Sequence, residues 1–328
     1  MIVVSRESDS ACIEREPAEL APAWSALSTD RQPPSVFLTP EWIATARAHE
    51  RSSPITLSVG TPVRGIAALA RETDGTITFA GGHLTDEQDV VAAPAHAADV
   101  ATSVARWVTE QRPPRVRLEF VPEERPTLDV FDSVLTAAGY RVTRARQIVS
   151  PLLALPTSYE DYVQSLGKKE RHELRRKVRR LEAAGATGFR FASDAERGEV
   201  LDRFFELHRL SRGEKAGFMT PNVERFFRDI ADTLAPLGRL RLGVLSFAGA
   251  DAAVLFGFSI GRVLQLYNAA YDPGLASLSV GIISHAWEIR EAIAQGYATY
   301  DLLRGDEPYK YDLGATDRWL ARLDAERA

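Results

Sequence analysis

The sequence is poor in the residues that build disulfides and metal centres. Among 328 residues there is one cysteine, Cys12, and six histidines that occur singly. A single thiol excludes an internal disulfide and a cysteine-based zinc cluster, and the scattered histidines show no metal-ligand spacing. We therefore expect no metal, and a protein of a reducing compartment.

Long apolar runs and several well-known catalytic signatures are also missing. The longest apolar stretches fall well short of the roughly 20 residues that cross a bilayer. The N-terminus has no basic segment followed by an apolar one. We therefore expect no membrane insertion and a cytoplasmic location. The glycine-rich loops of Rossmann and P-loop proteins and the G-x-S-x-G elbow of hydrolases are absent, so the sequence supports none of these sites.

Charge is unevenly distributed along the chain. The formal net charge is -5, yet "KKERHELRRKVRR" at residues 168–180 carries +6, which leaves -11 for the rest. Leu174, Val178 and Leu181 recur at helical spacing, so we expect a basic helix over 168–184 with one thin apolar stripe.

The cationic face of this basic helix has two interpretations. It is either a solvated surface, in which Glu173 and Lys177 pair one turn apart, or a phosphate-binding surface. A phosphate ligand would be a nucleotide-linked substrate such as CoA, or the backbone of a tRNA. The candidate phosphate- or tRNA-binding residues are Lys168, Arg171, Arg175, Arg176 and Arg179.

The two halves of the sequence follow the same order of predicted elements. Each half offers two helices, an antiparallel meander of three strands, a further helix and a further strand. The stretch from Pro151 to Pro156 separates the halves, so we expect domains at 1–152 and 153–328, of α/β (α+β) class. Each would have a mixed, largely antiparallel sheet flanked by helices. In the second half the elements fall at residues 194–212, 221–238, 239–249, 250–261, 262–272, 281–296 and 297–303.

A strand-loop-helix junction in the second half is a candidate ligand site. The strand that ends in "YNAAYDPG" leads through a loop of small residues into the helix at 281–296. Ser279 is expected to cap this helix, and Gly281 would let the backbone approach a ligand closely. Helix N-termini expose unpaired N–H groups, so the junction is either an ordinary capped helix or a phosphate site. His285, one turn further on, is expected to be a core histidine.

At this junction the sequence resembles a known family. The order "YDPG…SLSVGIISHAWEIREAIAQGYATYDLLRGDEPYK" resembles the C-terminal half of the CelD/BcsL-type acetyltransferases, a branch of the GNAT superfamily allied to the Fem aminoacyl transferases. Val280 stands where that family usually has proline. The resemblance implies tandem GNAT-like domains, with the chemistry in the second. The matching residues are Tyr271-Asp272, Ser279-Val280-Gly281, Gly296, Tyr300-Asp301 and Gly305 to Lys310.

The resemblance also implies roles for particular residues. Lys310, beside Tyr309, would stabilise negative charge on an oxyanion or a donor phosphate; the alternative is a surface lysine lying over Tyr309. Asp301, Asp306 and Glu307 would act as bases or bind the acceptor amine, although Asp306 and Glu307 equally suit a solvated turn. The residues expected to hold the donor are Tyr271, Ser279, Gly281 and Arg304, the last of which could instead pair with Asp306.

The function implied by the resemblance is acyl transfer to an amine by direct nucleophilic attack. The default donor is acyl-CoA, in the first place acetyl-CoA. One alternative is a Fem-like enzyme that uses aminoacyl-tRNA to form an amide on a small molecule or precursor. Another is a non-catalytic scaffold or binding module. The sequence does not indicate the acceptor or the oligomeric state.

Overall fold

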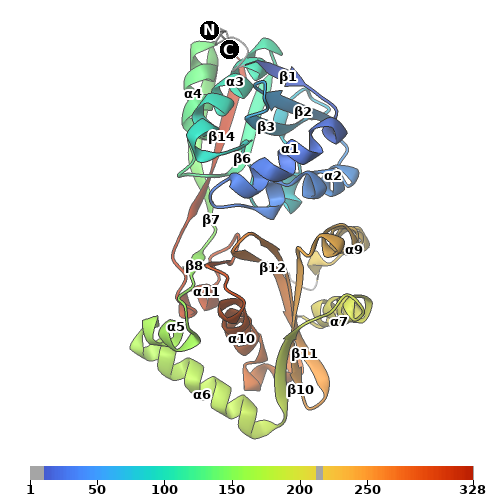
Figure 1. Ribbon diagram of the computed structural model, residues 1–328, viewed down its shortest axis with the longest axis vertical. Helices are drawn as coiled ribbons and strands as arrows, with labels where there is room; N and C mark the ends of the chain where they lie inside the picture. Colours follow the sequence, from blue (N-terminus) through green and yellow to red (C-terminus); the bar gives the residue numbers. More distant parts are fainter. Residues whose placement is uncertain (1–10, 212–216, 328) are drawn as a thin grey trace. The chain divides into compact units, whose positions relative to one another are not determined.

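The computed structural model describes residues 11–211 and 217–327, which fold into two compact units (Figure 1). The first unit comprises 1–149 and 318–328, and the second comprises 150–317. The first ten residues, part of the stretch on which the expected lack of a leader rests, lie outside the described residues. So does Arg212, the expected last residue of a helix.

The division differs from the expected domains 1–152 and 153–328 at the C-terminus. β14 (Trp319–Arg327) pairs with strands of the first unit on both of its edges, and Leu323 and Ala325 are buried in the core of that unit. Pairing between segments far apart in sequence leaves no local pattern, so the sequence predicts two contiguous domains. The strand pairing instead returns the C-terminus to the first unit.

The first unit is a mixed sheet covered by helices on both faces (Figure 1). α3 (Ala97–Glu110) and α4 (Thr127–Ala137) share a hydrophobic core with the sheet. β4 and β6 are parallel, and the other neighbouring strands are antiparallel. The strands lie in the order β1 (Cys12–Glu14), β2 (Ser53–Val59), β3 (Gly65–Arg71), β4 (Ile77–Phe79), β6 (Arg115–Pro122), β14 and β7 (Tyr140–Val149), with β5 (Val91–Ala92) also paired to β3.

The second unit repeats this plan. A three-stranded antiparallel meander is followed by α10 (Val280–Ala294) and then by β13, which pairs in parallel with the last strand of the meander. The expected tandem, largely antiparallel architecture is therefore confirmed. The strands lie in the order β8 (Leu152–Ala154), β13 (Thr299–Asp301), β12 (Val263–Tyr271), β11 (Ala250–Ile260), β10 (Leu240–Phe247) and β9 (Thr187–Phe191).

Local sequence signals explain where several helices begin. The Thr39 hydroxyl accepts the N–H of Trp42, and Pro40 occupies the first turn of α2, as expected from the Thr-Pro pair. Thr220 and Pro221 start α9 in the same way. The other helices are α1 (Pro17–Asp30), α2 (Pro40–Ala48), α5 (Tyr159–Ser165), α6 (Lys168–Ala184), α7 (Arg197–Leu210), α9 (Pro221–Leu234) and α11 (Pro308–Asp312), with 3-10 turns at Val36–Leu38, Gly82–Leu84, Pro94–His96, Ala235–Leu237 and Pro273–Leu278.

Aromatic side chains fix α7 and α9 against one face of the second sheet. The ring of Phe227 on α9 lies 5.7 Å from that of Phe204 on α7 and 4.8 Å from that of Phe256 on β11. All three side chains are fully buried, and each such burial contributes roughly 1.5–3 kcal/mol. α10 occupies the opposite face, so this sheet is covered on both sides.

No helix within 11–211 or 217–327 is long and apolar enough to span a bilayer.

Candidate active site

The second sheet opens where β12 leaves β13. The two strands pair over three residues only, from Val263 with Thr299 to Gln265 with Asp301. β12 continues to Tyr271 without a strand on that side, so a stretch of its edge offers unpaired backbone groups. Such a gap between parallel strands, next to the start of a helix, is a natural ligand site.

A cavity of about 330 Å³ lies beside this free edge and the start of α10. The final residues of β12, the first turns of α10 and one side chain of α11 form its wall. Four of the residues expected to bind donor or act in catalysis meet here: Tyr271, Ser279, Gly281 and Tyr309. The residues that line it are Leu255, Ala269, Ala270, Tyr271, Ala276, Ser279, Val280, Gly281, Ile282, Ser284, His285 and Tyr309.

The start of α10 differs in detail from the expected cap. Ser279 adopts a left-handed conformation with φ 60°, and its hydroxyl makes no capping hydrogen bond. The expectation of a Ser279 side-chain cap is therefore wrong. Gly281 makes room for Tyr271, because a Cβ at position 281 would lie 2.9 Å from the tyrosine ring. This close approach involves the protein's own aromatic ring, which is 41% exposed and covers the helix start.

Arg180 of α6 reaches the start of α10. Its Nη2 donates to the Ser279 Oγ at 2.7 Å, so a guanidinium stands next to the unpaired N–H groups of the first turn. The sequence predicted the basic helix, but Arg180 was not among its candidate phosphate-binding residues. The packing of α6 against the loop before α10 brings Arg180 to Ser279, a residue that lines the cavity.

His285 and Tyr309 form the inner wall of the cavity. Their rings stack with centroids 4.8 Å apart and planes 14° from parallel. His285 is buried, as expected of a core histidine, yet it also lines the cavity. Burial, with the charges of Glu307 and Glu288, raises the pKa of the Tyr309 phenol, so this group stays protonated at neutral pH.

Lys310 is placed differently from its expected catalytic position. Its side chain is 2% exposed, and Nζ donates to the carbonyls of Leu303 at 2.9 Å, Arg304 at 2.9 Å and Gly305 at 3.1 Å. Glu307 forms an ion pair with the same nitrogen at 3.0 Å. Three ammonium hydrogens serve three carbonyls, so none remains for an oxyanion or a phosphate. The structure gives Lys310 the role of fastening the loop after β13.

Asp301 is the last residue of β13, and Arg304 and Glu307 lie between that strand and α11. The Asp301 Oδ1 accepts a hydrogen bond from the backbone N–H of Leu303 at 2.9 Å. Leu303 has a left-handed backbone with φ 55°. Glu307 is 56% exposed and faces Lys310. The Arg304 carbonyl is one of the three, with those of Leu303 and Gly305, that accept hydrogen bonds from Lys310, an arrangement we call the Lys310 clamp. None of Asp301, Arg304 and Glu307 lines the cavity among the described residues. The described wall contains no carboxylate to serve as the expected base.

A buried carboxyl lies under α10. Glu288 is 1% exposed, accepts a short hydrogen bond from the Tyr300 hydroxyl, and has no hydrogen-bond partner at Oε1 among the described residues. Burial raises its pKa to about 8 and raises the pKa of Tyr300 well above its usual value. Glu288 is therefore protonated at neutral pH, and it joins α10 to β13 as a neutral hydrogen-bonding group.

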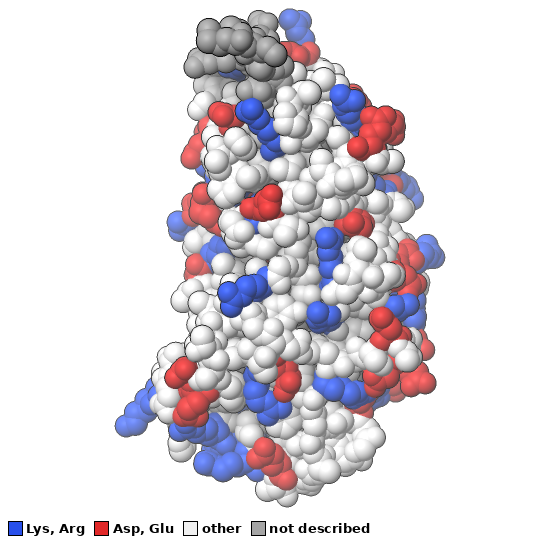
Figure 2. Space-filling model, viewed as in Figure 1, with Lys and Arg blue, Asp and Glu red and all other residues white. Residues whose placement is uncertain are grey.

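The basic helix α6 carries the predicted cationic face. Leu174 and Leu181 are buried, as the apolar stripe predicts, and Figure 2 shows Lys and Arg side chains gathered over α6. Glu173 pairs with Arg176 at 2.7 Å rather than with Lys177.

The five residues expected to bind phosphate or tRNA differ in how they are engaged. Arg175 pairs with Glu160, Arg176 with Glu173, and Arg171 donates to the Gln164 carbonyl and side chain. Within the described chain, Lys168 and Arg179 form no hydrogen bond or ion pair. On the cationic face of α6, Arg175 and Arg176 are therefore paired with carboxylates of the protein, whereas Lys168 and Arg179 are solvated.

The equivalent gap of the first unit is filled by the chain itself. β4 and β6 pair over two residues, and segment 80–90 then loops out before β5. The N–H of Gln88 donates to the Phe120 carbonyl on β6 at 3.1 Å, and the buried Asp89 carboxylate accepts from Arg31 and Arg125. The cavity left beside this segment measures about 10 Å³. The open gap therefore lies in the second unit.

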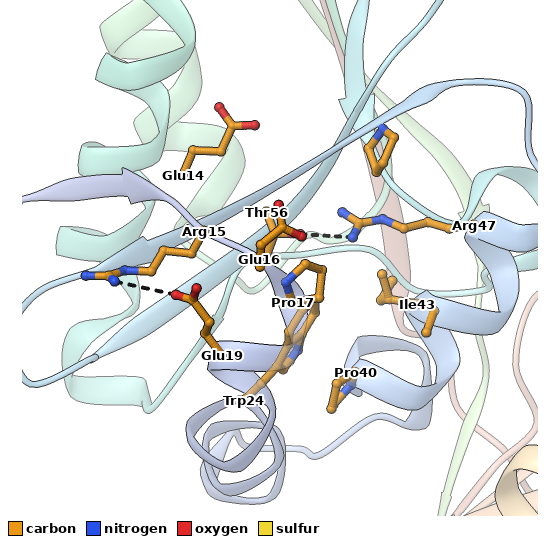
Figure 3. Close-up of a pocket in the computed structure, with 12 residues that line it drawn as sticks. Glu14, Arg15, Glu16, Pro17, Glu19, Trp24, Pro40, Ile43, Arg47 and Thr56 are labelled. Carbon is orange, nitrogen blue, oxygen red and sulfur yellow. Dashed lines mark hydrogen bonds and ion pairs between the residues drawn. The ribbon is translucent and has the colours of Figure 1, made fainter.

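The first unit has a larger hollow elsewhere, of about 710 Å³ (Figure 3). It lies among β1, α1, α2 and β2, and its charged groups pair locally. Arg15 contacts Glu19 at 3.6 Å, and Arg47 donates to the Thr56 hydroxyl at 2.9 Å. No sheet gap opens into it and no helix starts at it with small residues, so its geometry does not indicate a donor site.

Comparisons with known proteins agree with this placement. Residues 168–311 match the family model of the acetyltransferase (GNAT) domain, which covers the cavity and most of the second unit. No curated protein matches the sequence. The second unit is thus similar to a GNAT acetyltransferase domain over most of its length.

Solved structures show the same two-unit fold. FemX is 12% identical with a TM-score of 0.69, covering 96% of each chain. A tandem GNAT protein from the clavulanic acid biosynthesis pathway is 11% identical with a TM-score of 0.54, covering 97% of this chain and 98% of that one. At such identities the likeness shows the fold alone: a tandem GNAT arrangement.

In the part of the chain that the structure describes, no group of three or more His, Cys, Asp or Glu side chains is placed to hold a metal ion.

The clamp at Lys310 predicts a stability defect. Lys310→Ala leaves three inward-facing carbonyls without their donor, at a cost on the order of 3 kcal/mol in unfolding free energy, measurable by urea denaturation. Glu307→Gln is the matched control and should change stability little, because Glu307 is largely exposed. A Lys310→Ala protein of unchanged stability that has lost activity would contradict the clamp and restore the charge-donor role.

Glu288 predicts a pH-dependent stability. Between its ordinary pKa of 4.5 and the folded value of about 8, the folded protein holds a proton that the unfolded chain has lost. Stability should therefore fall as pH rises through this window, by up to about 1.4 kcal/mol per pH unit. Glu288→Gln removes the titration and should flatten this part of the profile of urea midpoints, whereas Glu291→Gln on the same helix should not. Parallel profiles for wild type and Glu288→Gln would show that Glu288 is already charged.

Proposed function

We propose that the chain is an N-acyltransferase that moves an acyl group, in the first place acetyl from acetyl-CoA, to an amine. The observation that carries the proposal is the cavity between the free edge of β12 and the start of α10, inside the segment that matches the GNAT domain. Acyl-CoA supplies an activated thioester and a chain of phosphates. The unpaired backbone groups of β12 would bind the thioester. The start of α10, with a cation beside it, would bind the phosphates.

The donor phosphates would lie at the first turn of α10. The N–H groups of Val280 and Gly281 come before the first intrahelical hydrogen bonds, and Arg180 stands beside them through Ser279. Tyr271 covers the same turn with its ring. This arrangement supports the donor role expected of Tyr271, Ser279 and Gly281, and it adds Arg180 to them.

Transfer would proceed by direct attack of the neutral amine on the thioester carbon. The N–C bond forms and the C–S bond breaks, the departing thiolate takes the proton that Tyr309 donates, and the proton lost by the amine passes through water to restore the Tyr309 hydroxyl. Tyr309 is protonated at neutral pH because burial raises its pKa, so its O–H can donate to the departing sulfur. His285, stacked on Tyr309, holds that ring in the wall.

An aminoacyl-tRNA donor is the second candidate. The observation in its favour is the cationic face of α6, where Lys168 and Arg179 are solvated next to paired arginines. A polyanion the size of a tRNA would contact several of these side chains at once, whereas CoA would reach only those near α10. A scaffold without catalysis would need neither contact.

Donor binding distinguishes these options without knowledge of the acceptor. CoA should raise the melting temperature of the wild-type protein. Arg180→Ala should weaken CoA binding about 10-fold or more in isothermal titration, the usual effect of losing a charged hydrogen bond to phosphate. Arg179→Ala is the matched control, since Arg179 adjoins Arg180 on α6 without reaching α10, and it should change the dissociation constant less than about 2-fold.

Two outcomes would contradict the acyl-CoA assignment. Failure of CoA to bind, together with salt-sensitive tRNA binding that weakens in Arg175→Ala, Arg176→Ala and Arg179→Ala, would favour aminoacyl-tRNA. Failure of both ligands to bind would favour the scaffold.

A further inference from the structure

A β-bulge turns Asn268 away from the donor cavity. Phe256 pairs with Asn268 and Gly257 with Leu266, so Tyr267 is an extra residue on β12. Leu266 and Ala269 pack on the α10 side of the sheet. Tyr267 instead contacts Phe227 of α9, and the Asn268 side chain contacts α7. The bulge therefore presents Asn268 on the face opposite the cavity, and bulges often re-aim side chains beside active sites.

The hydrogen bonds of Asn268 fix which way its amide points. The backbone N–H of Ala269 donates to the Asn268 Oδ1 at 2.8 Å, and a backbone N–H requires an oxygen as its acceptor. The same Oδ1 lies 3.0 Å from the Nε2 of His208, so that nitrogen must carry the hydrogen and donate it. The oxygen is thus used twice, and the two N–H groups of the Asn268 amide point elsewhere.

These two N–H groups have no protein acceptor within 11–211 and 217–327. Asn268 is half-buried, and its amide nitrogen is not among the sealed polar atoms that lack a partner, so a ligand can reach it. A half-buried donor pair on a fixed side chain favours a ligand with an accepting oxygen, because leaving such groups without a partner costs free energy.

His208 holds Asn268 in place. Its side chain is fully buried at the end of α7, and its ring centroid lies 5.5 Å from that of Phe204 and 5.9 Å from that of Phe218. The aromatic packing orients the imidazole, and the imidazole orients the amide through the 3.0 Å hydrogen bond. Because a fully buried histidine orients this one half-buried asparagine, we infer that the direction of the Asn268 amide is important for function.

Asn268 stands at the gap in the sheet. The pairing of β12 with β13 ends at Gln265, three positions earlier, and Ala269 to Tyr271, immediately after, line the donor cavity on the other face. If the donor lies on the α10 side, the opposite side of the gap, toward α7 and α9, is the second direction from which an amine can approach the thioester. Beyond the last residue pair with β13, β12 presents Tyr267 and Asn268 on that face; the ring of Tyr267 packs against Phe227, whereas Asn268 offers amide donors.

We propose that Asn268, positioned by His208, determines acceptor specificity by donating hydrogen bonds to an oxygen of the acceptor. The inference rests on the proposed acyl transfer and names its acceptor class. That class is amines that carry a carbonyl, carboxylate or hydroxyl oxygen near the reacting nitrogen, such as amino sugars and amino-acid amides. Simple alkylamines lack the oxygen and leave the Asn268 donors unpaired.

The test measures acetyl transfer from acetyl-CoA to D-glucosamine, glycinamide and n-hexylamine, with CoA binding measured on each protein. The wild type should favour at least one of the oxygen-bearing amines over n-hexylamine by about 100-fold or more in kcat/KM. Asn268→Leu should remove most of that preference by raising KM, with CoA affinity unchanged. Asn268→Asp keeps the size and the acceptor oxygen but loses both donors, so it should behave like Asn268→Leu.

His208 variants separate positioning from folding. His208→Gln retains an N–H donor for the Asn268 oxygen and should keep a substantial part of the preference. His208→Phe fills the aromatic site without a donor and should lose the preference, again through KM. Equal preferences in His208→Gln and His208→Phe, with both proteins folded by circular dichroism, would overturn the positioning role.

Four further results would contradict the proposed role of Asn268 or the proposed function on which it rests. An unchanged preference in Asn268→Leu, a wild type that favours n-hexylamine, or CoA binding without transfer to either oxygen-bearing amine would overturn the inference while leaving the donor site standing. Absence of CoA binding would instead remove the proposed function, and the inference with it.

Discussion

The clamp formed by Lys310 is the contact on which the geometry of the site depends. Three successive carbonyls, those of Leu303, Arg304 and Gly305, converge on one buried ammonium group. Carbonyls that point at one another repel unless a cation lies between them, so the lysine permits a tight turn directly after β13. That turn takes the chain away from the sheet after three residue pairs with β12. The gap, the cavity and the exposed edge of β12 all follow from this early departure.

The two units show how one fold can support a site in one copy and close it in the other. Both contain a meander, a helix and a strand parallel to the last strand of the meander. In the first unit, segment 80–90 bridges the gap, and Asp89 is held there by buried arginines. Its carboxylate binds the cations that would otherwise attract an anion, and the residual space is about 10 Å³ against about 330 Å³ in the second unit. Function therefore follows from the local filling of the gap rather than from the fold.

Features that depend on neighbouring residues were predictable from the sequence, whereas features that depend on packing were not. The Thr39 cap and the apolar stripe of α6 depend on residues within a turn or two of each other, and both were predictable. Ser279 has the right type and position for a cap, but its left-handed backbone directs the hydroxyl to Arg180 instead. Lys310 was recognisable as unusual, yet its partners are backbone carbonyls, which no side-chain pattern reveals.

The order of elements, the tandem plan and the resemblance of the second half to GNAT acetyltransferases were predictable from the sequence alone, because hydrophobic periodicity and motif order are properties of neighbouring residues. Tertiary structure decided which of those motif residues face a cavity. Tyr271, Ser279, Gly281 and Tyr309 meet around it, whereas Asp301, Arg304, Glu307 and Lys310 do not line it. It also decided that the last strand completes the first unit and that His208 meets Asn268 across 60 residues. Such choices depend on strand pairing and close packing between distant segments, and these are set only when the chain folds.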